Sequence, residues 1–204
     1  MEMEEILIPL TDNDDIYREI VKKHLNDRRI IINEEISDAL LESVCLMILR
    51  WNQEDKNMPI ESRKKIYIYL NSNGGDAIIG NSILSVIVNS KTPVITVGFA
   101  KCFSMASYIL AAGHKRYCFA NTVVLMHDGD TSYSSSRNKG KDIQKFYDSL
   151  FDRIDDFMVQ HTSMDKYFLN EIKDREYFIF AEEAKEKGIV DSIIGIDCDI
   201  DEIL

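Results

Sequence analysis

The sequence predicts a single α/β domain in which strands alternate with helices around one sheet. Short runs rich in β-branched and aromatic residues recur along the chain, for example in residues 66–71 and 93–99, and such runs favour strands. Each of these two runs is followed by a segment whose apolar residues recur at helical spacing. No Pro/Gly/Ser-rich segment divides the chain, so residues 1–204 are expected to share one core.

The elements of the first half follow from hydrophobic spacing and from turn residues. Apolar residues at helical spacing predict helices, and short apolar or alternating runs predict strands. Asp76 follows a glycine turn and is a typical residue for a helix start. In chain order we expect an acidic, flexible N-terminal arm over residues 1–15, a helix over 16–25, a buried strand over 29–33, a helix over 34–51, a polar surface connection over 52–65, a strand over 66–71 and a helix over 76–89.

The second half repeats the strand-to-helix pattern and adds a long helix. A strand over 93–99 leads toward a helix that begins near Ser104, and residues 128–142 form a polar, turn-rich connection. After this connection, one apolar stripe marks the long helix: Ile143, Phe146, Tyr147, Leu150, Ile154, Phe157 and Met158. The other expected elements are strands over 116–120 and 122–127, a helix over 164–173, a strand over 177–180, a helix over 182–187 that ends at Gly188, and a final strand over 189–196.

The composition argues against several classes of protein. The net charge is −11, which disfavours nucleic acid as a partner because proteins that bind it usually carry a basic stripe. No apolar run reaches about 18 residues and the acidic N-terminus lacks a signal-peptide pattern, so we expect a cytoplasmic protein that does not bind membranes. The four cysteines include no CxxC pair and no phosphate-binding glycine motif is present, so we expect no metal and no cofactor.

Ser104 stands where an apolar strand gives way to the helical segment SMASYILAA. At a helix N-terminus its hydroxyl would lie near unpaired backbone N–H groups, which favour negative charge. A serine that only caps the helix would give the same local pattern. The G-x-S-x-G motif of α/β-hydrolases is absent, because no glycine lies two residues from Ser104 on either side.

His127 ends the apolar segment TVVLMH, so its imidazole is expected at a strand tip that faces a loop. It is either a general base or a structural histidine bonded to a loop carbonyl. Ser104, then His127, then a later carboxylate is an order that predicts a serine hydrolase. The turn NSNGG, residues 71–75, is either an oxyanion hole built from backbone N–H groups or a plain tight turn.

Four segments in order resemble the ClpP family, the proteolytic subunits of the ATP-dependent Clp protease: NSNGGD, SMASYILAAG, LMH and REYFIFAEEAKEKGIVDSI. The resemblance covers residues 30–195. It implies a crotonase-like fold of repeated β-β-α units with a projecting helix. It also implies stacked heptameric rings around a proteolytic chamber, with residues 130–160 between the rings. A hexameric Clp ATPase would deliver unfolded proteins, because this chain has no nucleotide-binding loop of its own.

Carried over residue by residue, the resemblance implies that Ser104 is the nucleophile and His127 the general base. Gly75 and Met105 would donate their backbone N–H groups to the oxyanion. Glu176 falls where the family usually has aspartate, and acidic triad members vary between Asp and Glu. Asp174 is the reserve candidate for this role.

Besides Glu176, the sequence departs from the family pattern in three places. Asn73 replaces the usual proline of the glycine turn, Asp128 and Gly129 follow the histidine, and GFAKCF is two residues longer than usual. Cys102 is a chemical rival to the serine, but it lies in an expected strand and does not match the serine position. Two other functions therefore stay open. One is a non-catalytic structural or regulatory ring subunit, and the other is an acyl-CoA hydratase or isomerase that uses paired glutamates on the same fold.

Overall fold

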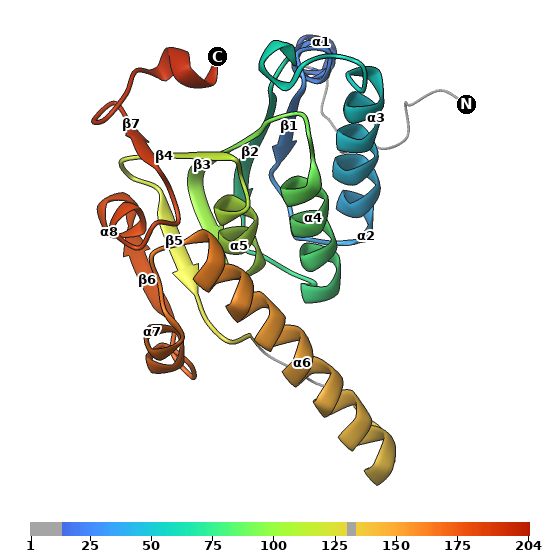
Figure 1. Ribbon diagram of the computed structural model, residues 1–204, viewed down its shortest axis with the longest axis vertical. Coiled ribbons are helices and arrows are strands. Elements are labelled where there is room, and N and C mark those ends of the chain that lie inside the picture. Colours follow the sequence, from blue (N-terminus) through green and yellow to red (C-terminus); the bar gives the residue numbers. More distant parts are fainter. Residues whose placement is uncertain (1–13, 130–133) are drawn as a thin grey trace.

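The computed structural model describes residues 14–129 and 134–204. Within these ranges, seven strands form one sheet with helices packed against it (Figure 1), which confirms the α/β class predicted from the sequence. The strands are β1 (Arg29–Ile32), β2 (Ile66–Ser72), β3 (Val94–Phe103), β4 (Lys115–Phe119), β5 (Val123–Met126), β6 (Tyr177–Phe180) and β7 (Ser192–Ile194). The helices are α1 (Asp14–Asn26), α2 (Asp38–Leu40), α3 (Leu46–Glu54), α4 (Ala77–Asn89), α5 (Met105–Ala111), α6 (Arg137–His161), α7 (Lys166–Glu171) and α8 (Ala181–Glu186).

The central strand of the sheet is β3, which has three neighbours. β1, β2, β3, β4 and β7 pair in this order and run parallel. β5 is also parallel to β3 but pairs with its last residues, 101–103, and β6 pairs antiparallel with β5. Consequently, the C-terminal ends of β3 and β5 lie at the same edge of the sheet as the N-terminal end of β6.

β3 contains two more residues than β2 between two paired positions. Leu70 pairs with Gly98 and Ser72 pairs with Cys102, so one residue of β2 lies opposite three residues of β3. A bulge of this kind bends a strand and redirects its side chains. The longer segment GFAKCF is accommodated here, and Phe99 at the bulge is 41% exposed.

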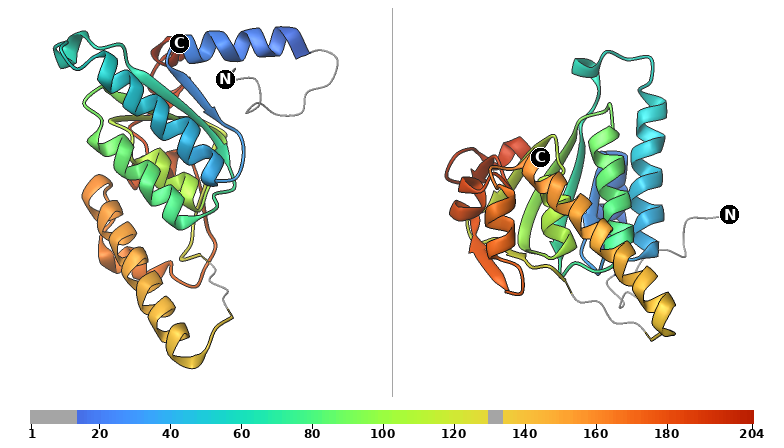
Figure 2. Two further views of the ribbon diagram at one scale, coloured as in Figure 1. Left: turned by 90° about the vertical axis from the view of Figure 1, so that its right-hand side faces the viewer. Right: turned by 60° about the horizontal axis from the view of Figure 1, so that its bottom comes forward.

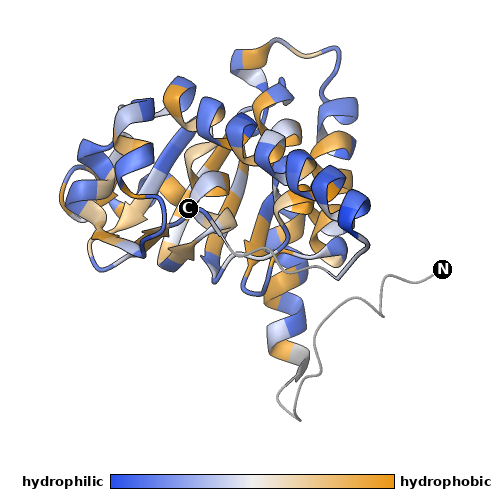
Figure 3. Cartoon of the chain, turned by 90° about the horizontal axis from the view of Figure 1, so that it is seen from below, coloured by the Kyte–Doolittle hydropathy of each residue, from blue (hydrophilic) through white to orange (hydrophobic). Residues whose placement is uncertain are grey.

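The two faces of the sheet are covered differently (Figure 2). Successive residues of a strand point to opposite faces, and in β2 Ile66 and Ile68 join the main core below α3, α4 and α5. Tyr67 and Tyr69 join a smaller cluster on the other face, where α1 lies. A 3₁₀ turn at the C-terminus covers this second cluster, and the Tyr69 hydroxyl donates to the Ile203 carbonyl oxygen at 2.5 Å. Figure 3 shows that the helices carry both hydrophobic and hydrophilic residues, as expected for helices that cover a sheet.

α6 projects from the body of the molecule (Figure 1). Its C-terminal half is packed against the core, because Leu150, Ile154 and Met158 are buried. Its N-terminal half extends away from the sheet, and Phe146 is 51% exposed there. The apolar stripe predicted from the sequence therefore joins the core from Tyr147 onward.

Several predicted boundaries are wrong. The helix expected over 34–51 begins at Asp38, contains a π-helical turn over Leu41–Cys45 and continues to Glu54. α6 begins at Arg137, inside the connection expected over 128–142, and residues 130–133 of that connection lie outside the described ranges. Because these polar residues carry no apolar periodicity, the sequence pattern alone favours a loop.

The two ends of the chain also differ from the expectation. The predicted arm over 1–15 lies outside the described ranges, except that its last two residues begin α1. The final strand expected over 189–196 shortens to β7, because Gly195 at φ +85° turns the chain away from the sheet. The C-terminal 3₁₀ turn, Ile200–Ile203, was not expected from the sequence.

The polar connection expected on the surface over 52–65 is partly buried. Asp55 is 3% exposed and Arg28 is 9% exposed. The Arg28 guanidinium donates to both oxygens of the Asp55 carboxylate, at 2.5 and 2.8 Å, and the Thr92 hydroxyl donates to the same carboxylate at 3.0 Å. This network ties the end of α3 to the residues before β1 and β3, so a buried charge is matched by a partner.

Replacing Asp55 with alanine is expected to lower the free energy of unfolding by about 3 to 5 kcal/mol, because the Arg28 guanidinium would stay buried without its partner. The hydrogen bond from Arg28 lowers the pKa of Asp55. The ionised carboxylate therefore stabilises the fold above its unfolded-state pKa of about 4, and this contribution is lost as the pH falls through the lowered pKa. Urea denaturation at a fixed protein concentration, from neutral to acidic pH, measures both effects.

Asp27 provides the matched control for Asp55. Its ion pair with Lys64, at 3.0 Å, joins side chains that are 35% and 54% exposed. Replacing Asp27 with alanine is expected to lower the free energy of unfolding far less than replacing Asp55, because solvent screens the pair. Equal losses in the two variants would contradict the assignment of a buried, stabilising network to Asp55.

Candidate active site

Ser104, His127 and Glu176 lie at one edge of the sheet because of the strand order. Ser104 follows β3, His127 follows β5, and Glu176 precedes β6. β3 and β5 are parallel and β6 is antiparallel to β5, so these three ends meet. In the β5–β6 ladder Met126 pairs with Tyr177, which sets His127 next to Glu176.

The three side chains form a continuous hydrogen-bonded chain. The Ser104 Oγ lies 2.8 Å from the His127 Nε2, and the His127 Nδ1 lies 3.1 Å from the Glu176 Oε1. In the tautomer with the proton on Nδ1, the imidazole donates to the carboxylate and accepts from the hydroxyl. The imidazole is mostly buried, whereas the Glu176 side chain is 59% exposed. The arrangement can transfer a proton from Ser104 to His127 while Glu176 orients the ring.

Ser104 itself adopts a strained backbone conformation, with φ 50° and ψ −127°. Positive φ is rare for residues other than glycine and costs about 1 to 3 kcal/mol. The Ser104 side chain makes no capping bond to α5 but contacts His127, so capping alone does not explain this serine. A sharp turn from a strand into a helix thus exposes the hydroxyl even though the motif G-x-S-x-G is absent.

The glycine turn packs directly against the turn that carries the serine. A Cβ atom added to Gly74 would lie 2.6 Å from the Phe103 carbonyl oxygen and 2.7 Å from the Ser104 Cβ. Gly74, which sequence analysis did not single out, therefore allows the two turns to approach. The donors expected for the oxyanion, the N–H groups of Gly75 and Met105, both border the same cleft as Ser104. Within the described ranges neither N–H group has a protein acceptor, so both are available to an oxyanion.

A cleft of about 980 Å³ opens beside the serine. One wall carries the glycine turn with Ser104 and His127, and the other carries residues 142–151 of α6. Phe146, Tyr147 and Phe151 of α6 line it, and the first two belong to the apolar stripe that predicted the long helix. The apolar wall opposite Ser104 can therefore bind apolar groups of a ligand.

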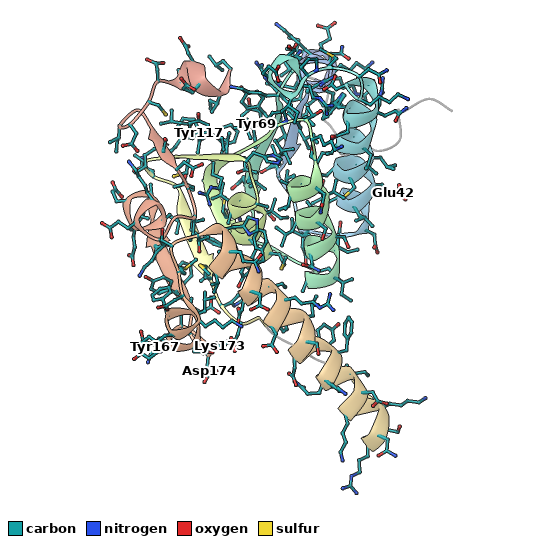
Figure 4. All side chains as sticks on the ribbon, viewed as in Figure 1. Glu42, Tyr69, Tyr117, Tyr167, Lys173 and Asp174 are labelled. Carbon is teal, nitrogen blue, oxygen red and sulfur yellow. The ribbon has the colours of Figure 1, made fainter. Side chains whose placement is uncertain are left out.

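The rival candidates do not reach the hydrogen-bonded chain. Cys102 is fully buried in β3, where its thiol points to the Leu70 carbonyl oxygen, and burial raises its pKa. It cannot supply a thiolate at neutral pH. Asp174 lies at the outer surface beside α7 (Figure 4), two residues from the carboxylate that contacts His127.

No group of three or more His, Cys, Asp or Glu side chains within residues 14–129 and 134–204 is placed to hold a metal ion. In the same part of the chain, no helix is long and apolar enough to cross a membrane. The Asp76 carboxylate, which borders the cleft, accepts from the N–H groups of Ile78 and Ile79 and so caps α4.

A comparison with protein families adds an independent finding to this geometry. The model of one family, described as Clp protease, matches residues 12–197.

Proposed function

The protein belongs to the Clp protease family, and from this premise we propose that it is a serine-type endopeptidase that cleaves unfolded proteins. At family level it is a ClpP-type peptidase with a crotonase-like fold, of a kind that works with Clp ATPases and forms oligomers. The observation that carries the proposal is the hydrogen-bonded chain from Ser104 through His127 to Glu176.

In the proposed reaction, His127 Nε2 takes the proton of Ser104 as the Oγ attacks the scissile carbonyl carbon. The N–H groups of Gly75 and Met105 stabilise the oxyanion that develops. His127 then gives the proton to the leaving amine, and water hydrolyses the acyl-enzyme with His127 as the base. Glu176 accepts the Nδ1–H bond throughout and stabilises the imidazolium.

We also propose stacked heptameric rings, a cytoplasmic location and delivery of substrates by a hexameric Clp ATPase. The projecting α6 supports the stacking, because a helix that leaves the body of its own subunit is available to another one. The ATPase would supply the ATP-driven delivery of unfolded chains, because this sequence has no nucleotide-binding loop of its own.

A fluorophosphonate probe tests the proposed activity directly. An assembled triad is expected to react at Ser104, and mass spectrometry of the labelled peptide locates the adduct. Heat-denatured protein supplies the background. No labelling above this background would refute the peptidase and favour the non-catalytic ring subunit, which the exposure of Glu176 keeps as the second candidate.

The acyl-CoA hydratase or isomerase has less support. That chemistry uses paired glutamates, and among the described residues that line the cleft Glu35 is the one glutamate. Binding of an acyl-CoA thioester, measured by calorimetry, would reverse this ranking.

Replacing Glu176 with glutamine is expected to lower kcat for a fluorogenic peptide by about 100-fold, because the amide no longer stabilises the imidazolium. The effect is smaller than for a buried triad carboxylate, since solvent already screens a side chain that is 59% exposed. Asp174→Asn is the matched control, and its kcat is expected within about twofold of the wild-type value, as for a surface change remote from the reacting atoms. A larger loss in the control than in Glu176→Gln would transfer the acidic role to Asp174.

A further inference from the structure

Tyr108 borders the large cleft together with Ser104 and His127. It lies in α5, one turn after Ser104, and is 8% exposed. Its hydroxyl donates to the backbone carbonyl oxygen of His127 at 3.4 Å. His127 lies one residue beyond the last ladder position of β5, so its main chain needs a support other than the strand.

A small cavity adjoins this contact. Its volume is about 30 Å³, and roughly 10 to 15 Å³ is enough for one water molecule. Tyr108, Asp128 and Asp155 supply polar groups to its wall, and Met126, Phe151, Leu169 and Ile172 supply apolar ones. A single water molecule there has enough polar partners to be stable.

The Tyr108 hydroxyl is protonated at neutral pH and can act as a donor. Burial, together with the carboxylates of Asp155 and Asp128, raises the pKa of Tyr108 further. Lys173, which pairs with Asp155 at 3.0 Å, also lines the cavity. Residues from α5, α6, α7 and the end of β5 therefore surround the cavity beside the Tyr108 hydroxyl.

We infer that Tyr108 is a positioning residue for the proposed peptidase. Its hydroxyl and one water molecule in the small cavity hold the main chain of His127, and this keeps the imidazole between Ser104 and Glu176. The inference rests on the proposed function, because a held imidazole matters only if His127 acts as the base. A contact at 3.4 Å is long for one hydroxyl bond, which is why the water molecule is part of the support.

The variant Tyr108→Phe removes the hydroxyl and keeps the ring. Its kcat for a fluorogenic peptide is expected to fall about 10-fold, which corresponds to about 1.4 kcal/mol. KM is expected to stay within about twofold, because the variant keeps the ring that borders the cleft. Tyr117→Phe is the matched control. Tyr117 is also buried, 6% exposed, and its hydroxyl contacts Glu202 at 3.3 Å in the second hydrophobic cluster. Figure 4 shows Tyr117 beside Tyr69, at the opposite end of the body from Lys173.

Crystal structures of the wild-type protein and of both variants separate positioning from a loss of stability. The wild-type structure is expected to contain one ordered water molecule within hydrogen-bond distance of the Tyr108 hydroxyl. In Tyr108→Phe the imidazole is expected to move from Ser104 by more than about 0.5 Å, the tolerance of a preorganised site. In Tyr117→Phe it stays in place.

An empty cavity in the wild-type structure would overturn the inference, even if Tyr108→Phe failed to fold. Equal kcat values for the two variants would overturn it as well. A wild-type protein that neither reacts with the fluorophosphonate nor cleaves peptides would refute the proposed function instead, and the displacement of the imidazole would then still decide the role of Tyr108.

Discussion

Replacement of Ser104 with alanine is expected to lower kcat/KM for peptide hydrolysis by about 10⁴-fold or more, since losing the nucleophile of a triad removes the whole acyl-enzyme route. The alanine methyl group cannot attack a carbonyl carbon, as the Ser104 hydroxyl, 2.8 Å from His127 Nε2, is proposed to do. Steady-state hydrolysis of a fluorogenic peptide measures the loss, and a burst experiment shows whether any acyl-enzyme still forms.

Cys102→Ala is the control for the Ser104 variant. Its side chain is fully buried two residues before the serine, and burial raises the pKa of its thiol. Activity is expected within about threefold of the wild-type value, because the sulfur only fills space and an alanine leaves a small cavity. If Ser104→Ala kept its activity while Cys102→Ala lost it, the nucleophile would be the thiol and not the hydroxyl.

The sequence predicted the fold well where hydrophobic period and turn residues agreed. The alternation in β2 defined both faces of the sheet, and the glycines after it marked the turn beside the serine. The prediction from sequence failed where polar side chains are buried because they form ion pairs or hydrogen bonds with each other. Asp55 lies in a segment that reads as a surface loop, and its burial is explained by two partners distant in the sequence, Arg28 and Thr92.

The choice between Glu176 and Asp174 shows a second limit of sequence reasoning. Both acids precede β6, and each is compatible with a triad by residue type alone. In the structure, pairing of Met126 with Tyr177 sets Glu176, the residue before the strand, next to His127. Register is a property of two strands together, so a single sequence does not reveal it. Tyr108 was missed for a similar reason, since its spacing in α5 is that of an ordinary buried residue.

Gly74→Ala is expected to lower kcat/KM by about 100-fold or more and to destabilise the protein by about 2 kcal/mol or more. The added Cβ would lie 2.6 Å from the Phe103 carbonyl oxygen and 2.7 Å from the Ser104 Cβ, so backbone atoms at the nucleophile must shift. The backbone also has φ +92° there, which alanine rarely adopts. Kinetics with a fluorogenic peptide, the rate of fluorophosphonate labelling and urea denaturation measure these losses.

Gly195→Ala separates the two causes of that expected loss. Gly195 has φ +85°, close to the value at Gly74, but a Cβ there would meet no atom within 4 Å. This control carries the conformational cost of alanine at positive φ, about 1 kcal/mol, without the collision. Full activity in Gly195→Ala beside a loss in Gly74→Ala would assign the loss to the close approach of the glycine turn and the serine turn. Equal activity in the two variants would mean that the site tolerates a shift of the strained serine, and preorganisation of its hydroxyl would then not explain catalysis.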